Sequence, residues 1–173
     1  YTAIHDATDL PLILYNVPSR TGVNINPETA KELSKLPRIN GIKEASGNLE
    51  QVKAIHDLCG DELNIWSGND DQIYDLMELG GKGVISVLSN ICPQAAHDIP
   101  AKYLAGDKEG SKALMDKYMK LAKAMFVDVN PIPVKEAVSL IGFNAGPVRL
   151  PLIEMDEKNK EYVKNTMDEY GLL

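Results

Sequence analysis

A lysine and a tyrosine at matching places on two strand-like runs are the residues of this sequence best suited to covalent chemistry. Lys43 lies near the end of the run Ile39–Glu44, and Tyr15 lies near the end of the preceding run, Leu12–Asn16. A lysine held in a dry pocket loses its proton more easily, and the neutral amine attacks a ketone to form a Schiff base. A phenol beside it can carry protons. The pair therefore indicates imine chemistry.

Each residue of this pair also has a simpler interpretation. A lysine at a strand end more often reaches solvent or pairs with a neighbouring carboxylate, which here is Glu44. A strand tyrosine more often packs its ring and hydrogen-bonds its hydroxyl group. Taken one at a time, the two positions leave both interpretations open.

Other polar residues give weaker signals. Arg20 lies in the loop Pro18–Gly22, and its planar guanidinium suits a substrate carboxylate, although a loop arginine is more often a surface charge. Asp70 and Asp71 are explained by helix capping, so no catalytic role is assigned to them. The three histidines are scattered singly without ligand spacing, which predicts no metal site; they are His5, His56 and His97.

Composition narrows the class of protein. The 173 residues are 44% hydrophobic and 25% charged, which is typical of a globular protein. The net charge of -7 argues against a nucleic acid or an anionic membrane as partner and favours a small-molecule ligand. The two cysteines have no metal or redox spacing, and neither a signal peptide nor an 18-residue apolar stretch is present. These features predict a cytoplasmic protein.

Four apolar runs, each followed by a segment with helical spacing, predict a βα repeat; the runs are Leu12–Asn16, Ile39–Glu44, Leu63–Ser67 and Val84–Leu88. Such a repeat forms a parallel sheet covered by helices, either a barrel or an open doubly wound sheet. The first turn lacks the glycine fingerprint of a dinucleotide site, which disfavours a nucleotide-binding open sheet. In either architecture the carboxyl ends of the strands meet the ligand, and Tyr15 and Lys43 fall there.

The strand signals stop at Lys108, and three helical stretches follow, at Leu114–Met125, Val134–Ile141 and Tyr162–Met167. We therefore place a domain boundary near Gly106-Asp107. Residues 1–107 are expected to form the part with strands, which carries Lys43, and residues 108–173 a C-terminal helical domain.

Five ordered motifs resemble the dihydrodipicolinate synthase (4-hydroxy-tetrahydrodipicolinate synthase) family, within the superfamily of pyruvate-dependent class I aldolases and N-acetylneuraminate lyase. The likeness covers nearly the whole chain and outweighs the simpler interpretations of Lys43 and Tyr15. The motifs are Tyr15–Gly22, Gly41–Asn48, Ser67–Asp71, Gly83–Val87 and Asn130–Lys135.

The resemblance implies an α/β fold: the C-terminal half of a TIM (β/α)8 barrel, strands five to eight, followed by a three-helix domain. It implies that Lys43 forms a Schiff base with pyruvate and that Tyr15 relays protons. Arg20 would hold the carboxylate of aspartate semialdehyde, and the backbone of Ile85 would contact pyruvate. The implied enzyme is a lyase of the first committed step of diaminopimelate and lysine biosynthesis. It would need no metal or organic cofactor and would form a homo-oligomer, either a dimer or a tetramer.

Two alternatives stay open. Sister aldolases of the superfamily share the lysine and the tyrosine, although Arg20 and the pair Glu44-Ala45 favour the synthase. A non-catalytic half-barrel used as an interaction module would keep its lysine by descent.

The chain begins at Tyr1 without a methionine, so we expect its front to be missing, and the resemblance implies that the missing part is the first half of the barrel. The missing part would hold a Gly-Thr-Thr-Gly-Glu motif whose threonine completes the proton relay. We therefore expect the isolated chain to be inactive or barely active. We also expect it to pair with another molecule through its exposed strand edges.

Overall fold

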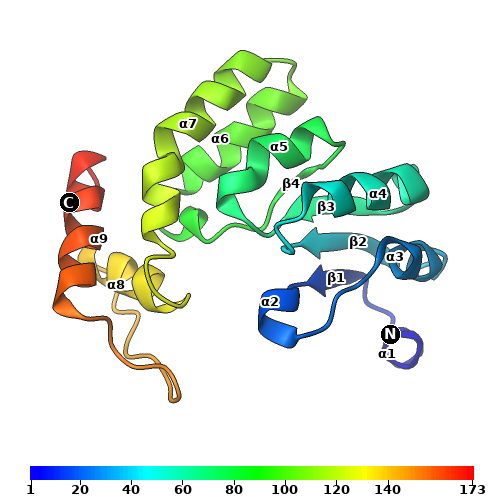
Figure 1. Ribbon diagram of the computed structural model, residues 1–173, viewed down its shortest axis with the longest axis horizontal. Helices are drawn as coiled ribbons and strands as arrows, with labels where there is room; N and C mark the ends of the chain where they lie inside the picture. Colours follow the sequence, from blue (N-terminus) through cyan, green and yellow to red (C-terminus); the bar gives the residue numbers. More distant parts are fainter. The chain divides into compact units, whose positions relative to one another are not determined.

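The computed structural model describes residues 1–173 and divides them into two compact units, Tyr1–Ile85 and Ser86–Leu173 (Figure 1). The first unit contains α1 (Thr2–Asp6), β1 (Leu12–Asn16), α2 (Pro18–Thr21), α3 (Pro27–Ser34), β2 (Ile39–Glu44), α4 (Leu49–Cys59), β3 (Asn64–Ser67), α5 (Ile73–Glu78) and β4 (Gly83–Val84). The second unit contains α6 (Pro93–Leu104), α7 (Lys108–Ala124), α8 (Ile132–Leu140) and α9 (Glu157–Glu169). Short 3₁₀ turns occur at Gly60–Glu62, Asp70–Gln72 and Leu88–Asn90.

The first unit is built on a parallel sheet with the strand order β1-β2-β3-β4. The predicted bounds of the first two strands are confirmed, and β3 begins one residue later than predicted. The fourth prediction, Val84–Leu88, is wrong, because β4 spans only Gly83–Val84. The amide of Ile85 donates to Ser67 O at 2.8 Å. Because Ser67 is the last residue of β3, the residues after Ile85 have no strand residue with which to pair.

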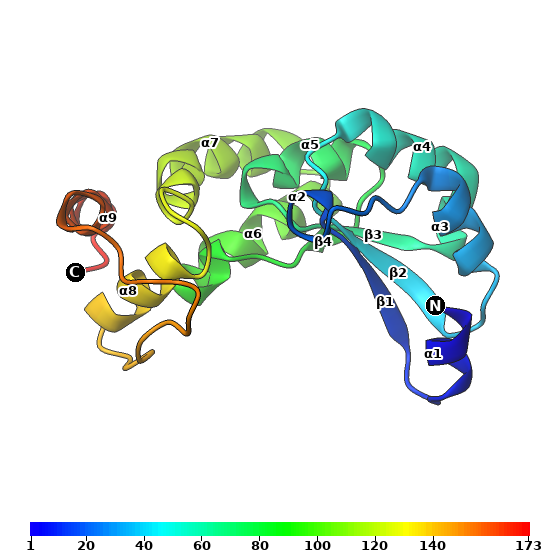
Figure 2. The ribbon, with the colours of Figure 1, turned by 60° about the horizontal axis from the view of Figure 1, so that its bottom comes forward.

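Helices α3 and α4 lie on the same side of the strands (Figure 2). Pro27 begins α3 at a position where the missing amide hydrogen is no loss. The apolar stripe of α4 is buried as its spacing predicts, at Val52, Ile55 and Cys59. These side chains form a core with inward residues of the strands, among them Leu14, Ile42 and Ile65. Alternate strand residues therefore face the helices, and the residues between them face the other way.

The N-termini of two helices differ from expectation. Asn26 precedes α3 as predicted, but its Oδ1 accepts a hydrogen bond from Asn24 Nδ2 and caps no helix amide. Asp70, predicted to cap the third helix, lies inside a 3₁₀ turn instead. That turn is held by Asn69, whose Nδ2 donates to Gln72 Oε1 at 2.9 Å, so α5 begins later, at Ile73.

Helix α4 has a true side-chain cap, and its removal is expected to lower the free energy of unfolding by about 1 kcal/mol. Asn48 Oδ1 accepts from the amides of Glu50 and Gln51 at 3.0 and 3.2 Å. Asn48→Ala leaves both amides without that acceptor, whereas Asn48→Asp retains one. Urea unfolding followed by the fluorescence of Trp66, the single tryptophan, measures the difference. Equal stability of the alanine and aspartate variants would contradict the expectation.

The three predicted C-terminal helical stretches are confirmed as α7, α8 and α9. They share a core with α6 and with the 3₁₀ turn Leu88–Asn90, and the fully buried members include Leu121, Met125 and Met167. Buried Ser111 of α7 donates to Ile99 O of α6 at 2.7 Å. Packing thus groups α6 with the C-terminal helices, and the domain boundary near Gly106-Asp107 stays a prediction. None of the helices combines the length and the apolar character needed to cross a membrane.

Candidate functional site

Tyr15 and Lys43 are neighbours on the sheet face opposite α3 and α4. They are register partners at the carboxyl ends of β1 and β2. Along β1 the residues Leu14 and Asn16 are buried, whereas Tyr15 is 48% exposed. The Nζ atom of Lys43 lies 4.2 Å from the centroid of the Tyr15 ring, within the range of a cation–π contact. The structure therefore brings the predicted pair together.

Glu44 is not a partner of Lys43. Consecutive strand residues point to opposite faces, and Glu44 is buried, with 2% of its surface exposed. Its carboxylate accepts from Asn16 Nδ2 at 2.9 Å, from the Ser46 amide at 2.6 Å and from Gln51 Nε2 at 3.1 Å. The interpretation of Lys43 as one half of a surface ion pair with Glu44 is therefore wrong.

Gly68 leaves the space that the Lys43 side chain occupies. A Cβ atom at this position would lie 3.0 Å from Lys43 Cε and 2.6 Å from Ala45 Cβ. The backbone of Gly68 is also held, because its amide donates to Glu44 O at 2.8 Å. The glycine is thus required by the close approach of two strand ends. In the sequence, Gly68 stood out only as part of the motif Ser67–Asp71, and this role was missed.

Trp66 lies on the other side of Lys43, as its register partner on β3. A Cβ atom at Gly41 would lie 2.1 Å from the indole ring, and one at Gly83 would lie 3.5 Å from it. Glycines on both neighbouring strands therefore accommodate the indole. The sequence analysis did not single out Trp66. The available signal was that the strands on either side of it each contain a glycine, Gly41 and Gly83, which leaves room for a large side chain.

The other two predicted site residues follow strands of the same sheet. Arg20 is exposed in the short helix α2, directly after β1. Ile85 follows β4, and its amide already donates to Ser67 O, so its carbonyl is the backbone group that remains for a ligand. All four residues thus stand at or beyond the carboxyl ends of parallel strands, where ligands of such sheets bind.

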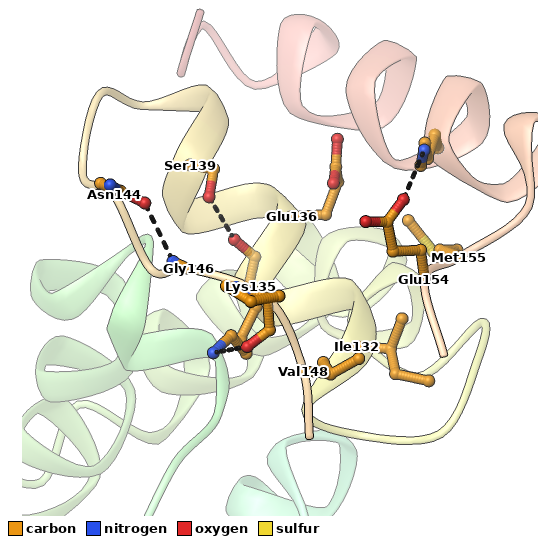
Figure 3. A pocket seen from close by; sticks show the side chains of 11 residues that line it. Ile132, Lys135, Glu136, Ser139, Asn144, Gly146, Val148, Glu154 and Met155 are labelled. Carbon is orange, nitrogen blue, oxygen red and sulfur yellow. Dashed lines mark hydrogen bonds and ion pairs between the residues drawn. The ribbon is translucent and has the colours of Figure 1, made fainter. Parts of the chain in front are cut away.

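A cavity of about 320 Å³ lies in the second unit and contains none of these residues (Figure 3). The cavity is lined by residues of both positive and negative charge, namely Lys135, Lys160, Glu136 and Glu154. Lys135 Nζ donates to Pro147 O at 2.9 Å, and the hydrogen bond with Glu157 raises the pKa of Lys160. Both amines are therefore held as donors and are unsuited to attack a carbonyl.

Comparison with known proteins decides the family. Residues 1–170 match the model of the dihydrodipicolinate synthetase family. The chain belongs to this family. It is 55% identical over 172 residues to the 4-hydroxy-tetrahydrodipicolinate synthase of Caldicellulosiruptor saccharolyticus, covering 99% of this chain and 58% of that protein.

Solved structures of family members have the same fold. The dihydrodipicolinate synthase of Thermotoga maritima matches with a TM-score of 0.95 and 42% identity, over 100% of this chain and 60% of that one. The chloride-inhibited enzyme of Acinetobacter baumannii, solved in complex with pyruvate, matches with a TM-score of 0.95 and 40% identity over the same shares. The chain thus spans about three-fifths of the length of these relatives.

This member of the dihydrodipicolinate synthetase family brings together no group of three or more His, Cys, Asp or Glu side chains that could hold a metal ion. His5 and His97 each contact only the adjacent aspartate among the carboxylates, through Nδ1 at 2.8 and 2.9 Å.

The two thiols of this family member are expected to react slowly. Cys59 and Cys92 are buried, and burial raises the pKa of both thiols. A higher pKa lowers the thiolate fraction at neutral pH, and packing also blocks access. Alkylation by iodoacetamide at pH 7.5 should be at least about tenfold slower in the native chain than in urea. Mass spectrometry of both states measures the rates, and equal rates would contradict the expectation.

Proposed function

We propose that this chain supplies the Schiff-base lysine of a 4-hydroxy-tetrahydrodipicolinate synthase, which condenses pyruvate with aspartate semialdehyde. The observation that carries the proposal is the Lys43 amine 4.2 Å from the Tyr15 ring at the carboxyl ends of adjacent strands, in a member of this family. The pyruvate complex of the Acinetobacter baumannii relative supports pyruvate as the first substrate.

In the proposed reaction, the neutral amine of Lys43 attacks the ketone carbon of pyruvate. The nitrogen–carbon bond forms, the ketone oxygen leaves as water, and the Tyr15 hydroxyl carries the protons between nitrogen and oxygen. Loss of a methyl proton then makes an enamine, which attacks the aldehyde carbon of the second substrate. Water releases the product from Lys43. When the methyl proton leaves, the protonated imine accepts the electron pair that remains on carbon. The proposed path therefore uses no metal or organic cofactor.

The remaining predicted residues have binding roles in the proposal. The Arg20 guanidinium offers a planar pair of donors to the carboxylate of aspartate semialdehyde. The Ile85 carbonyl lies at the end of β4 for contact with pyruvate. The reaction would commit its product to diaminopimelate and lysine biosynthesis in the cytoplasm. The chain would act there as part of a homo-oligomer.

The uncovered sheet face supports the proposal that β1 to β4 are strands five to eight of a (β/α)8 barrel. On that face Ile13 is 51% exposed and Tyr15 is 48% exposed. The apolar side chains and the unpaired edges of β1 and β4 favour association. We expect the chain to sediment as a dimer or larger species at micromolar concentration. A folded monomer across a dilution series would contradict this expectation.

Trapping with borohydride tests the proposed function. In the full-length protein, pyruvate and borohydride together should add a stable mass to the peptide that contains Lys43. Lys43→Arg should lose the adduct, and Lys53→Arg, at an exposed lysine of α4 paired with Asp57, should keep it. Absence of an adduct in the full-length protein, or an adduct spread evenly over many lysines, would contradict the proposal and favour the interaction module.

A further inference from the structure

We infer that Glu44, on the far side of the sheet from the reacting groups, is a positioning residue that sets the Tyr15–Lys43 pair and the Arg20 loop. Its consequence for chemistry rests on the proposed function, whereas its geometric part stands on contacts alone. The carboxylate is 2% exposed and faces away from Lys43, so it cannot touch a substrate bound there.

The contacts of Glu44 require both of its carboxylate oxygens to accept hydrogen bonds. Oε2 accepts from Asn16 Nδ2 and Gln51 Nε2, at 2.9 and 3.1 Å, and Oε1 accepts from the Ser46 amide at 2.6 Å. All three donors are N–H groups, which a carboxylate accepts without conflict. A neutral amide in its place turns an N–H group toward another N–H group.

The Glu44 contacts lock the strand ends that carry the reacting pair. Asn16 and Glu44 are register partners, one residue beyond Tyr15 and Lys43. Just past them, Ala45 N donates to Asn16 O at 2.9 Å. A side-chain bond and a backbone bond therefore join β1 to β2 at the same level. Any slip of one strand along the other would separate the amine from the phenol.

The same network closes the loop that carries Arg20. The Ile25 amide donates to Asn16 Oδ1 at 2.9 Å, and Asn16 Nδ2 also donates to Asn24 Oδ1 at 2.9 Å. Asn24 in turn exchanges hydrogen bonds with Gln51 of α4, at 2.7 and 3.2 Å. The loop leaves β1 at Asn16 and returns to the same side chain, so Arg20 is held between two anchored ends.

Substitution by glutamine tests the role of the carboxylate. Glu44→Gln should slow the formation of the pyruvate adduct on Lys43 by about tenfold, because the reacting pair loses its alignment. Glu50→Gln, at an exposed residue in the first turn of α4, is the matched control and should leave the rate unchanged. Should Glu44→Gln fail to fold, Gln51→Leu removes one of the three donors to Glu44, together with the two hydrogen bonds to Asn24, and should slow the reaction by a smaller factor.

An exchange of donor and acceptor provides a rescue. In the double variant Asn16→Asp with Glu44→Gln, the amide donates from position 44 to a carboxylate at position 16. The side-chain amides of Asn24, Gln51 and Asn26 can turn over to match, Asn26 because its Oδ1 accepts from Asn24 Nδ2. Recovery of most of the adduct rate is expected, because the hydrogen-bond pattern is restored.

A readout that needs no pyruvate separates positioning from stability. The Tyr15 ring should shift the ε-methylene protons of Lys43 upfield in the NMR spectrum of the native chain. In folded Glu44→Gln the shift should shrink, and in the double variant it should return. An unchanged shift together with an unchanged adduct rate would overturn the inference. Absence of the adduct in the full-length protein would overturn the proposed function instead, and the NMR shift would still decide the positioning role.

Discussion

Gly68→Ala is expected to slow formation of the pyruvate adduct on Lys43 by about a hundredfold, the effect of a misplacement of about 1 Å. The new Cβ would lie 2.6 Å from Ala45 Cβ, which is fixed to its own backbone, and 3.0 Å from Lys43 Cε. The strand ends must therefore separate or the lysine must leave its position over the Tyr15 ring. Either change removes the alignment of amine and phenol. Adduct formation against time, measured by mass spectrometry at saturating pyruvate, gives the rate.

Two further variants separate displacement from loss of stability. Gly47→Ala strains a backbone at φ +78° but meets no atom within 4 Å, so it should weaken the fold and leave the adduct rate nearly unchanged. Ala45→Gly in the Gly68→Ala background removes the closest contact and should restore part of the rate. A Gly68→Ala chain that reacts at the native rate would show that Lys43 does not need this space.

Ile55→Ala is expected to lower the free energy of unfolding of the first unit by about 3 kcal/mol. Ile55 is fully buried on α4, in the core that the helices share with the sheet. The substitution loses the transfer free energy of the removed carbons and leaves a cavity that rigid strands cannot fill. Urea unfolding followed through Trp66, which lies in β3 of the same unit, reports the change.

Leu58→Ala is the matched control for Ile55→Ala, because Leu58 lies one turn further along α4 and is 44% exposed. Its truncation should change the free energy of unfolding by less than about 1 kcal/mol. Similar losses for both variants would show that α4 does not pack on the sheet through the face that contains Ile55.

The elements that repeat a clear pattern were predictable from the sequence. The bounds of β1 and β2 were predicted correctly because each run contains isoleucine and is followed within three residues by proline or glycine, which end strands. The buried stripe of α4 followed from helical spacing. The fourth strand was not predictable in the same way. Val84–Leu88 is apolar enough for a strand, but strand length depends on the partner, and β3 ends at Ser67.

The sequence by itself determined the residue types that can do the chemistry, a lysine and a tyrosine near the ends of successive strands, and the family to which the motifs point. Tertiary structure alone decided that Tyr15 and Lys43 are register partners and that Glu44 faces the opposite side of the sheet. It also decided that Gly68 leaves room for the lysine. The physical reason is that strand register and the close approach of strand ends depend on contacts between residues far apart in the chain, such as the hydrogen bond from Asn16 to Glu44. The local sequence pattern does not predict such contacts.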